Sequence, residues 1–372
     1  MQSNLFIQTL KPYIPIAHKI WETPNQSAIL KLDWNESTKP PSPKVFAALE
    51  QALQHDNLHW YPNTKNETLL QLLSTYTALP SSCIELFASS DCAHEFILQV
   101  FAKTLDSVCI IAPTYDNFRS SAQGRGLQSL FFYTDESGKI DWHKLDVFLE
   151  SKNPQMLYIC NPNNPTGTLH DINALQSLIY KYKHIAFIVD EAYYEFCGIS
   201  LGYIVPHTPN LIITRTFSKA FGLASFRIGY CLSAPQNIAA LNRLRNAKNI
   251  PHFSQIAAIA ALEDIAYMQQ YVKEVKKAKQ YFLHELESIQ DFTMYHTEAN
   301  FVFLHYNNAA ALCDFLESKG VYIRNYTHIL PNHCRISIGT KTQMQKVASY
   351  IQDFIAQTHT IKEHNETDSS DF

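Results

Sequence analysis

Short, continuous apolar runs recur along the middle of this 372-residue chain, and stretches with helical spacing separate them. A run of four to eight apolar residues predicts a strand that is buried on both faces, since a strand with one exposed face would alternate apolar and polar residues. Strands that alternate with helices indicate an α/β fold, with a mostly parallel sheet sandwiched by helices. The runs that predict strands are 84–89, 107–113, 128–134, 155–160, 185–191 and 210–216.

The pattern changes near residue 245. A long helical pattern at about 265–290 is followed by apolar segments at 300–306, 320–324 and 334–339 and by a closing helix to about 357. This mixture predicts a second, smaller α+β domain. We therefore expect four parts: an N-terminal arm with part of the small domain (1–41), a large domain (42–245), the small domain (246–358) and a polar tail (359–372).

Composition excludes several classes of protein. Hydrophobic residues make up 46% of the chain and charged residues 17%, which favours a large core over disorder. The net charge of −4 argues against a nucleic-acid partner, and no apolar run reaches the ~18 residues of a membrane span. The start of the chain lacks the pattern of a signal peptide. We expect a cytoplasmic protein without a membrane partner.

Cysteine and histidine spacing argues against a metal site. The eight cysteines form no C-x-x-C pair and lie mostly in apolar runs, as free buried thiols do in a reducing compartment. The sixteen histidines form no H-E-x-x-H. We expect no metal.

Three polar segments each follow a predicted strand, at the edge where open α/β sheets bind ligands. They are N-P-N-N-P-T-G (161–167), V-D-E-A-Y (189–193) and T-F-S-K-A-F-G (216–222), the last with Arg227 beyond it. Alone, each is consistent with a proline-rich turn, a strand-end acid or a solvated loop. Together they supply an aspartate, a lysine and a hydroxyl-and-arginine phosphate site, which is what pyridoxal phosphate chemistry requires.

In their order and spacing these motifs resemble those of the fold-type I pyridoxal phosphate enzymes, the aspartate aminotransferase superfamily. The resemblance implies that Lys219 carries the cofactor and moves the substrate proton, and that Asp190 pairs with the pyridine nitrogen. It also implies that Tyr193 and Asn164 hydrogen-bond to the phenolic oxygen of the cofactor. The catalytic residues would be Lys219, Asp190 and Tyr193.

The resemblance implies a phosphate site as well. The residues that would hold the cofactor phosphate are Thr216, Ser218, Arg227 and the start of a predicted helix at Ser90, Asp91 and Cys92. Tyr115 matches the aromatic residue that stacks on the pyridine ring, with a tyrosine in a turn as the alternative. Tyr61 matches the tyrosine that reaches the partner's cofactor phosphate in a homodimer, and a turn aromatic is again the alternative.

Within the superfamily, the chain resembles the histidinol-phosphate aminotransferases over almost its whole length. The matching segments are 11–13, 35–36, 41–43, 61–62, Arg324 and 334–339. This resemblance implies that the substrate is bound by Tyr13, Asn35, Arg324 and Arg335. Two arginines at strand ends suit a dianionic phosphate, although Arg324 could instead form a surface or interdomain ion pair.

The chain departs from that family at three places on the substrate and phosphate sides. Ser37, Thr38 and Pro40 replace Asn, Pro and Gly, and Ser89 and Cys92 replace Gly and Glu. The stretch 325–328, N-Y-T-H, also differs. These departures bear on the identity of the substrate more than on the chemistry.

We therefore expect a homodimeric pyridoxal phosphate-dependent aminotransferase that acts by ping-pong transamination on amine and oxo-acid substrates. The amine, or its carbonyl partner, would be small and phosphorylated, such as histidinol phosphate or serinol phosphate. A decarboxylase of a phosphorylated amino acid and an amino-acid:2-oxo-acid aminotransferase remain as alternatives. So does a non-enzymatic regulator or scaffold, although every catalytic position is filled.

Overall fold

The computed structural model describes residues 1–11 and 19–368, with only the backbone of residues 359–368. Its described residues form two compact units. The large unit holds 1–11, 39–272 and 296–299, and the small unit holds 19–38, 273–295 and 300–368. We describe each unit by itself.

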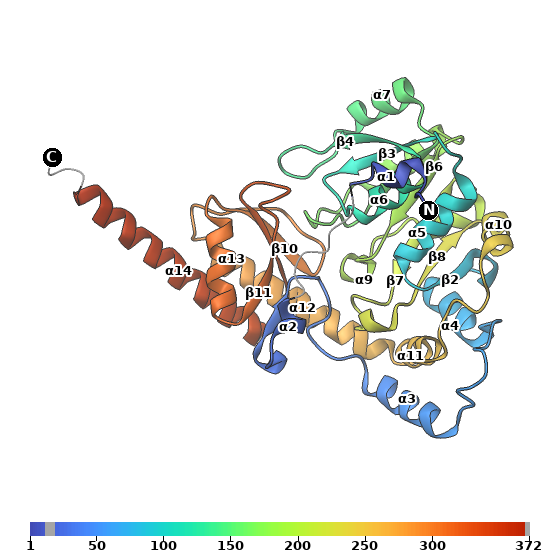
Figure 1. The fold of residues 1–372 in the computed structure, drawn as a ribbon, viewed down its shortest axis with the longest axis horizontal. Helices are drawn as coiled ribbons and strands as arrows, with labels where there is room; N and C mark the ends of the chain where they lie inside the picture. Colours follow the sequence, from blue (N-terminus) through green and yellow to red (C-terminus); the bar gives the residue numbers. More distant parts are fainter. Residues whose placement is uncertain (12–18, 369–372) are drawn as a thin grey trace. The chain divides into compact units, whose positions relative to one another are not determined.

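Seven strands form the sheet of the large unit, in the order β2-β8-β7-β6-β5-β3-β4 (Figure 1). Strands β4, β3, β5, β6 and β7 pair in parallel, whereas β8 is antiparallel to both β7 and β2. The prediction of a mostly parallel sheet is confirmed. The strands are β2 (Ile84–Phe87), β3 (Ser107–Ala112), β4 (Gln128–Tyr133), β5 (Met156–Cys160), β6 (Ala186–Asp190), β7 (Leu211–Thr216) and β8 (Gly229–Ser233).

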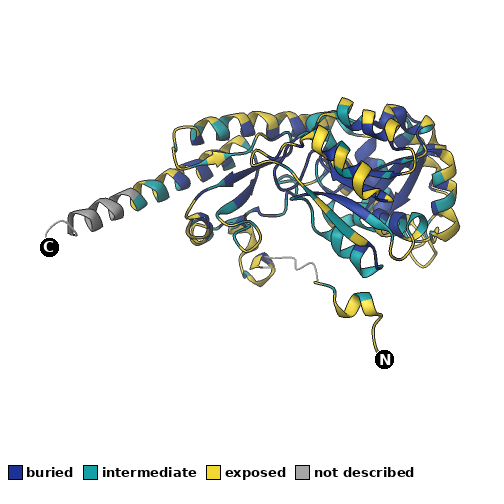
Figure 2. Ribbon diagram, turned by 90° about the horizontal axis from the view of Figure 1, so that it is seen from above, coloured by how far each residue is buried: buried dark blue, intermediate teal, exposed yellow. Residues whose placement is uncertain are grey.

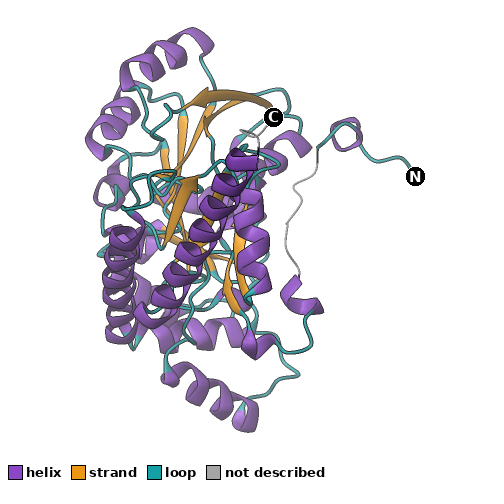
Figure 3. Ribbon diagram, turned by 90° about the vertical axis from the view of Figure 1, so that its left-hand side faces the viewer, coloured by secondary structure: helices purple, strands orange, loops and turns teal. Residues whose placement is uncertain are grey.

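Apart from the edge strand β4, these strands are buried along most of their length (Figure 2). The apolar runs predict this burial for β2, β3, β5, β6 and β7. Helices flank the sheet (Figure 3). The helices that lie wholly within this unit are α1 (Leu5–Gln8), α3 (Pro43–His55), α4 (Glu67–Thr77), α5 (Ser90–Phe101), α6 (Asn117–Gly124), α7 (Trp142–Lys152), α8 (Ile172–Lys181), α9 (Tyr194–Cys197), α10 (Pro235–Leu244) and α11 (His252–Leu262).

Local sequence sets the start of α3. Ser42 caps the helix, because its hydroxyl accepts a hydrogen bond from the backbone N–H of Lys44 at 3.1 Å, and Pro43 occupies the first helical position. Helix α11 packs on α3 and α4. For that reason residues 246–272, which the sequence assigned to the small domain, belong to the large unit, and α12 (Ile265–Leu286) carries the chain from one unit into the other.

The small unit has a five-stranded sheet in the order β1-β11-β12-β10-β9. Only β1 and β11 pair in parallel. Its elements are α2 (Lys19–Glu22), β1 (Leu30–Leu32), β9 (Thr293–Met294), β10 (Phe301–His305), α13 (Ala309–Ser318), β11 (Val321–Asn325), β12 (His333–Ser337) and α14 (Lys341–Asp368). The last helix extends beyond residue 357, where the sequence predicted its end, and into the predicted polar tail (359–372).

In the described part of the chain, no helix combines the length and the apolar character that crossing a membrane requires.

Candidate active site

The three sequence motifs lie at the carboxyl ends of β5, β6 and β7, which are neighbours in the parallel part of the large sheet. Backbone hydrogen bonds join these ends. The N–H of Asn161 donates to the carbonyl of Asp190 at 2.8 Å, and the N–H of Glu191 donates to the carbonyl of Thr214 at 2.9 Å. The motifs therefore meet at one edge of the sheet, as the sequence predicts.

Asp190 ends β6 with a buried carboxylate that is 3% exposed. Its oxygens accept hydrogen bonds from the Tyr158 hydroxyl at 3.0 Å and from the Ala192 N–H at 3.1 Å. Burial raises the pKa of Asp190, and the nearby His94, whose Nε2 lies 3.9 Å from Oδ2, partly offsets that shift. A cationic ring nitrogen facing this carboxylate would favour its charged form.

Hydroxyl and guanidinium groups gather after β7. The Ser218 N–H donates to Thr216 Oγ1 at 3.1 Å, and the two side-chain hydroxyls lie 2.9 Å apart. Arg227 reaches back to them, since its Nη1 lies 3.4 Å from Ser218 Oγ. Its Nη2 forms an ion pair of 3.4 Å with Asp91, in the first turn of α5. The residues predicted to hold the cofactor phosphate after β7 and at the start of α5 thus lie close together.

The amino end of α5 completes this group. Ser89 precedes the helix with φ of +103°, a conformation that glycine adopts far more easily, and its hydroxyl accepts from the Cys92 N–H at 3.3 Å. Gly229 of β8 lies close beside it, because a Cβ at that position would come within 2.8 Å of the Ser90 nitrogen. The departure from glycine at residue 89 therefore leaves the helix start capped and closely packed.

Asn163 connects the loop after β5 to the loop after β3. Its side-chain oxygen accepts from Thr114 Oγ1 at 2.9 Å, and its amide donates to the Pro113 carbonyl at 2.9 Å. Two predicted cofactor residues, Tyr115 and Asn164, lie next to these contacts, and Asn164 is buried.

Lys219 directly follows the hydroxyl pair, and its Nζ lies 5.9 Å from the centre of the Tyr193 ring. The large unit thus offers helix N–H groups, two hydroxyls and a guanidinium for a phosphate, with an amine and a buried carboxylate nearby. This donor set fits pyridoxal 5'-phosphate. When bound, that cofactor withdraws electrons from the substrate carbon that carries the amine.

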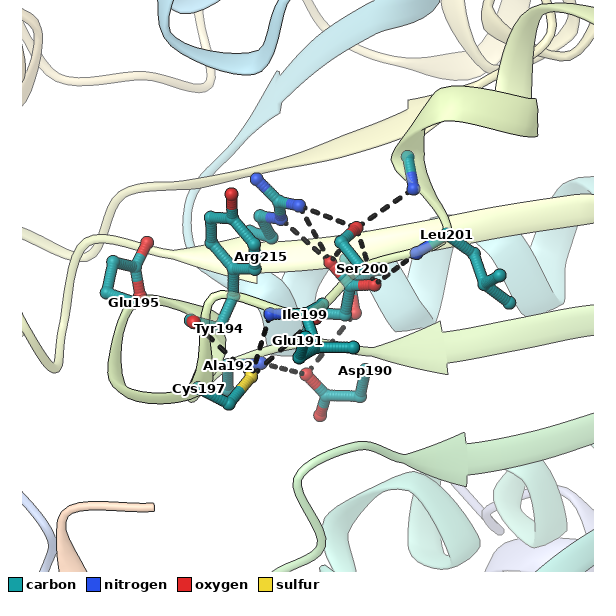
Figure 4. Close-up of polar contacts among 12 residues, drawn as sticks. Asp190, Glu191, Ala192, Tyr194, Glu195, Cys197, Ile199, Ser200, Leu201 and Arg215 are labelled. Atoms are coloured by element: carbon teal, nitrogen blue, oxygen red, sulfur yellow. Dashed lines mark hydrogen bonds and ion pairs between the residues drawn. The ribbon is translucent and has the colours of Figure 1, made fainter. Parts of the chain in front are cut away.

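A buried ion pair that the sequence analysis missed lies beside these motifs (Figure 4). Glu191 and Arg215, which are 2% and 3% exposed, approach to 2.9 Å. Ser200 bridges them, because its hydroxyl lies 2.8 Å from Glu191 Oε2 and from Arg215 Nη2. The guanidinium also stacks on the Tyr194 ring at 3.5 Å. Arg215, a charge inside an apolar strand run, was the signal that such a partner exists.

Comparison with known proteins identifies the fold and the chemistry. The family model described as aminotransferase class I and II matches residues 27–351. This chain belongs to that family. It is an aminotransferase that depends on pyridoxal 5'-phosphate.

Named relatives cover nearly the whole chain of this aminotransferase. A dihydroxyacetone phosphate transaminase of Campylobacter jejuni is 49% identical over 358 residues, 95% of this chain and 97% of the relative. A histidinol-phosphate aminotransferase of Ruminiclostridium cellulolyticum is 30% identical over 349 residues, 92% of this chain and 96% of the relative. The resemblance to histidinol-phosphate aminotransferases is confirmed.

A solved structure shows the same fold. It is the histidinol-phosphate aminotransferase of Sinorhizobium meliloti in complex with pyridoxal-5'-phosphate, with a TM-score of 0.85 at 24% identity. The similarity covers 95% of this chain and 97% of that one.

The small unit of this aminotransferase holds two arginines that were predicted to bind the substrate. Arg324 and Arg335 lie directly opposite each other on β11 and β12, and they are only 7% and 5% exposed. Arg324 is next to the end of β11, but Arg335 is in the middle of β12 rather than at a strand end. Paired residues of neighbouring strands share a face of the sheet, so both arginines occupy the same face.

Asn35 is attached to the same sheet. Its N–H donates to Ser337 Oγ at 2.9 Å, and its carbonyl accepts from the Asn300 amide at 3.1 Å. Ser337 lies two residues beyond Arg335 and therefore points to the same side of β12. Three predicted substrate residues, Asn35, Arg324 and Arg335, thus come together within the small unit.

Tyr61, which was predicted to reach the partner's cofactor phosphate, is 77% exposed, and Lys248 Nζ lies 4.2 Å from its ring centre. Tyr13 lies outside the described residues. The thiol of Cys92 is half-buried, and burial raises its pKa.

Proposed function

We propose that this aminotransferase transfers an amino group between an amino acid and a small phosphorylated carbonyl compound. The favoured substrate is dihydroxyacetone phosphate, whose amine counterpart is serinol phosphate. The observation that carries the proposal is the pair of buried arginines, Arg324 and Arg335, opposite each other on one sheet face. Two planar guanidinium groups suit the charge and the oxygen geometry of a phosphate dianion. The name of the 49% identical relative supports the same choice.

The large unit supplies the chemistry in this proposal. Lys219 carries the cofactor, and its amine moves the proton at the amine-bearing carbon of the substrate. Asp190 favours the protonated ring nitrogen, because the two charges are opposite. The phenolic oxygen of the cofactor is bound by Tyr193 and Asn164, and Tyr115 stacks on its ring. The cofactor phosphate is held by Ser90, Asp91, Cys92, Thr216, Ser218 and Arg227.

Histidinol phosphate is the second candidate, because several relatives near 30% identity carry that name. Histidinol phosphate and serinol phosphate both carry a phosphate group and differ in the rest of the molecule, so the arginine pair could bind either compound. The loop 325–328, which departs from that family beside the arginines, favours the other substrate.

A half-reaction tests the proposal. Cofactor-loaded enzyme is mixed with serinol phosphate, histidinol phosphate or unphosphorylated serinol, and absorbance follows conversion of the bound cofactor to its amine form. Serinol phosphate should react with kcat/KM at least about 100-fold above that of serinol, because charged hydrogen bonds to the phosphate are lost. Equal values for serinol and serinol phosphate would overturn the proposal.

We further propose that the active form is a homodimer. Large apolar side chains are exposed on α3 and in the loop after it, which favours a protein interface. They are Phe46, Leu53, Leu58, Trp60 and Tyr61. Tyr61 would reach the partner's cofactor phosphate. Light scattering at assay concentration should give the mass of two chains, and an active monomer would contradict this arrangement.

A further inference from the structure

The hairpin between β11 and β12 places Tyr326 beside both arginines of the small unit. The centre of its ring lies 5.8 Å from Arg324 Cζ and 5.5 Å from Arg335 Cζ. Its hydroxyl accepts a hydrogen bond from Arg335 Nη1 at 3.1 Å. One side chain therefore touches both guanidinium groups.

The Tyr326 ring is itself held in place. Phe303 of β10 packs edge-to-face against it at 5.4 Å and 82°. The backbone N–H of Tyr326 donates to the His333 carbonyl at 3.0 Å, and its carbonyl accepts from the N–H groups of Ile329 and Leu330 at 2.8 Å each. Since backbone and ring are both fixed, the hydroxyl has one position relative to β12.

Two like charges directly opposite each other on neighbouring strands repel. An aromatic face attracts guanidinium groups, and a phenol oxygen accepts from them, so Tyr326 lowers the cost of keeping the arginines together. Arg335 is further oriented by a hydrogen bond of 2.7 Å from Nη2 to the Asp33 carbonyl and by the Phe301 ring at 5.2 Å.

We propose that Tyr326 is a positioning residue that makes this site prefer phosphorylated substrates. It holds Arg324 and Arg335 at the spacing at which both contact one phosphate group, before that group arrives. This arrangement favours a dianion that needs both arginines over an uncharged hydroxyl that needs neither. The inference rests on the proposed function, because it takes Arg324 and Arg335 as the site that binds the phosphate of the substrate.

Two substitutions separate the parts of the side chain. Tyr326→Phe removes only the hydroxyl that accepts from Arg335, and Tyr326→Leu also removes the ring. The matched control is Tyr295→Phe, since Tyr295 packs on the same Phe303 at 5.0 Å but directs its hydroxyl to His333 Nε2 at 3.2 Å. Steady-state kinetics with serinol phosphate and with serinol, and inhibition by inorganic phosphate, are measured for each cofactor-loaded enzyme.

Tyr326→Phe should raise the KM for serinol phosphate and the inhibition constant of inorganic phosphate about fivefold to tenfold, with kcat within about twofold. Tyr326→Leu should raise both further. Neither variant should change kcat/KM for unphosphorylated serinol by more than about twofold, and Tyr295→Phe should match the unmodified enzyme in all three measurements.

The outcomes distinguish the inference from the proposed function. If Arg324→Gln and Arg335→Gln raise the KM for serinol phosphate while both Tyr326 variants leave it unchanged, the positioning role is wrong and the proposed function stands. Equal losses on serinol and serinol phosphate in the Tyr326 variants also overturn that role. If the arginine variants leave the KM unchanged, the proposed function fails, and the inference fails with it.

Discussion

The two units of this aminotransferase hold their charged groups by different means. In the large unit, the polar groups lie at or just after the carboxyl ends of parallel strands, and each group belongs to a motif that is contiguous in sequence. In the small unit, the arginines lie within strands, and cross-strand register places them opposite each other. Topology alone gathers the first set at one sheet edge, whereas the second set depends on strand pairing. The chemistry is therefore encoded in contiguous motifs, whereas the proposed substrate-phosphate site depends on the register between β11 and β12.

The largest expected effect is at Lys219 in the large unit. Lys219→Ala should lower turnover by about 10⁴-fold or more, because we propose that Lys219 both carries the cofactor and moves the substrate proton. Borohydride treatment followed by mass spectrometry should then find no cofactor attached to the chain. The exposed Lys183 provides the control, since Lys183→Ala should keep both properties. A borohydride-stable adduct in Lys219→Ala would contradict the assignment.

A buried ion pair in the large unit and an exposed ion pair in the small unit should contribute differently to the free energy of unfolding. Arg215→Ala leaves the Glu191 carboxyl group buried without its partner guanidinium, so the free energy of unfolding should fall by about 3–5 kcal/mol. The counterpart in the small unit is Glu317, whose pair with Lys19 is largely exposed, and Glu317→Ala should cost less than about 1 kcal/mol. Urea unfolding followed by circular dichroism measures both. Equal costs would show that burial does not make the Glu191–Arg215 pair more important for stability than the exposed pair.

Substitutions of Asp190 should affect the electronic state of the cofactor ring rather than the binding of the cofactor. Asp190→Ala should still bind the cofactor but lose about 100-fold or more in kcat, since the variant lacks the charge that we propose stabilises the protonated ring nitrogen. Cofactor retention is read from absorbance after gel filtration. Asp190→Asn keeps the shape and removes the charge, so it should lose a similar factor. Near-normal turnover in either variant would mean that another acid fills this role.

Among Lys219, Asp190 and Arg324, the smallest effect is expected at Arg324 in the small unit. Arg324→Gln should raise the KM for serinol phosphate about 10- to 100-fold through the loss of a charged hydrogen bond, with little change in kcat. Arg324→Gln should therefore change KM and leave kcat nearly constant, whereas Lys219→Ala should abolish turnover. A fall in kcat at constant KM would place Arg324 in the chemistry and remove the contrast between the units.

The sequence predicted much of the fold of the large unit, because buried parallel strands leave continuous apolar runs. It did not predict β8 (Gly229–Ser233). This strand begins two residues after Arg227, and no polar stretch marks its boundaries. It also assigned residues 246–272 to the small domain, whereas they belong to the large unit. The assignment failed because α11 packs on α3 and α4, which are far from it in sequence.

The same limit applies to the site. Segments 161–167, 189–193 and 216–222 could be located because each is a contiguous motif after a strand. The contacts of Glu191 with Arg215 and of Tyr326 with Arg335 join residues whose relation only strand pairing or a hairpin creates. Nothing in the local sequence specifies them. This is why the chemistry was easier to predict than the substrate.

The most direct test of the central claim follows the nitrogen itself. Serinol phosphate labelled with nitrogen-15 is incubated with the cofactor-loaded enzyme and a mixture of 2-oxo acids, and the products are identified by mass spectrometry. The account predicts that the label appears in an amino acid and that dihydroxyacetone phosphate forms in equal amount. Label that stays in serinol phosphate, while unphosphorylated amines transfer theirs, would contradict it.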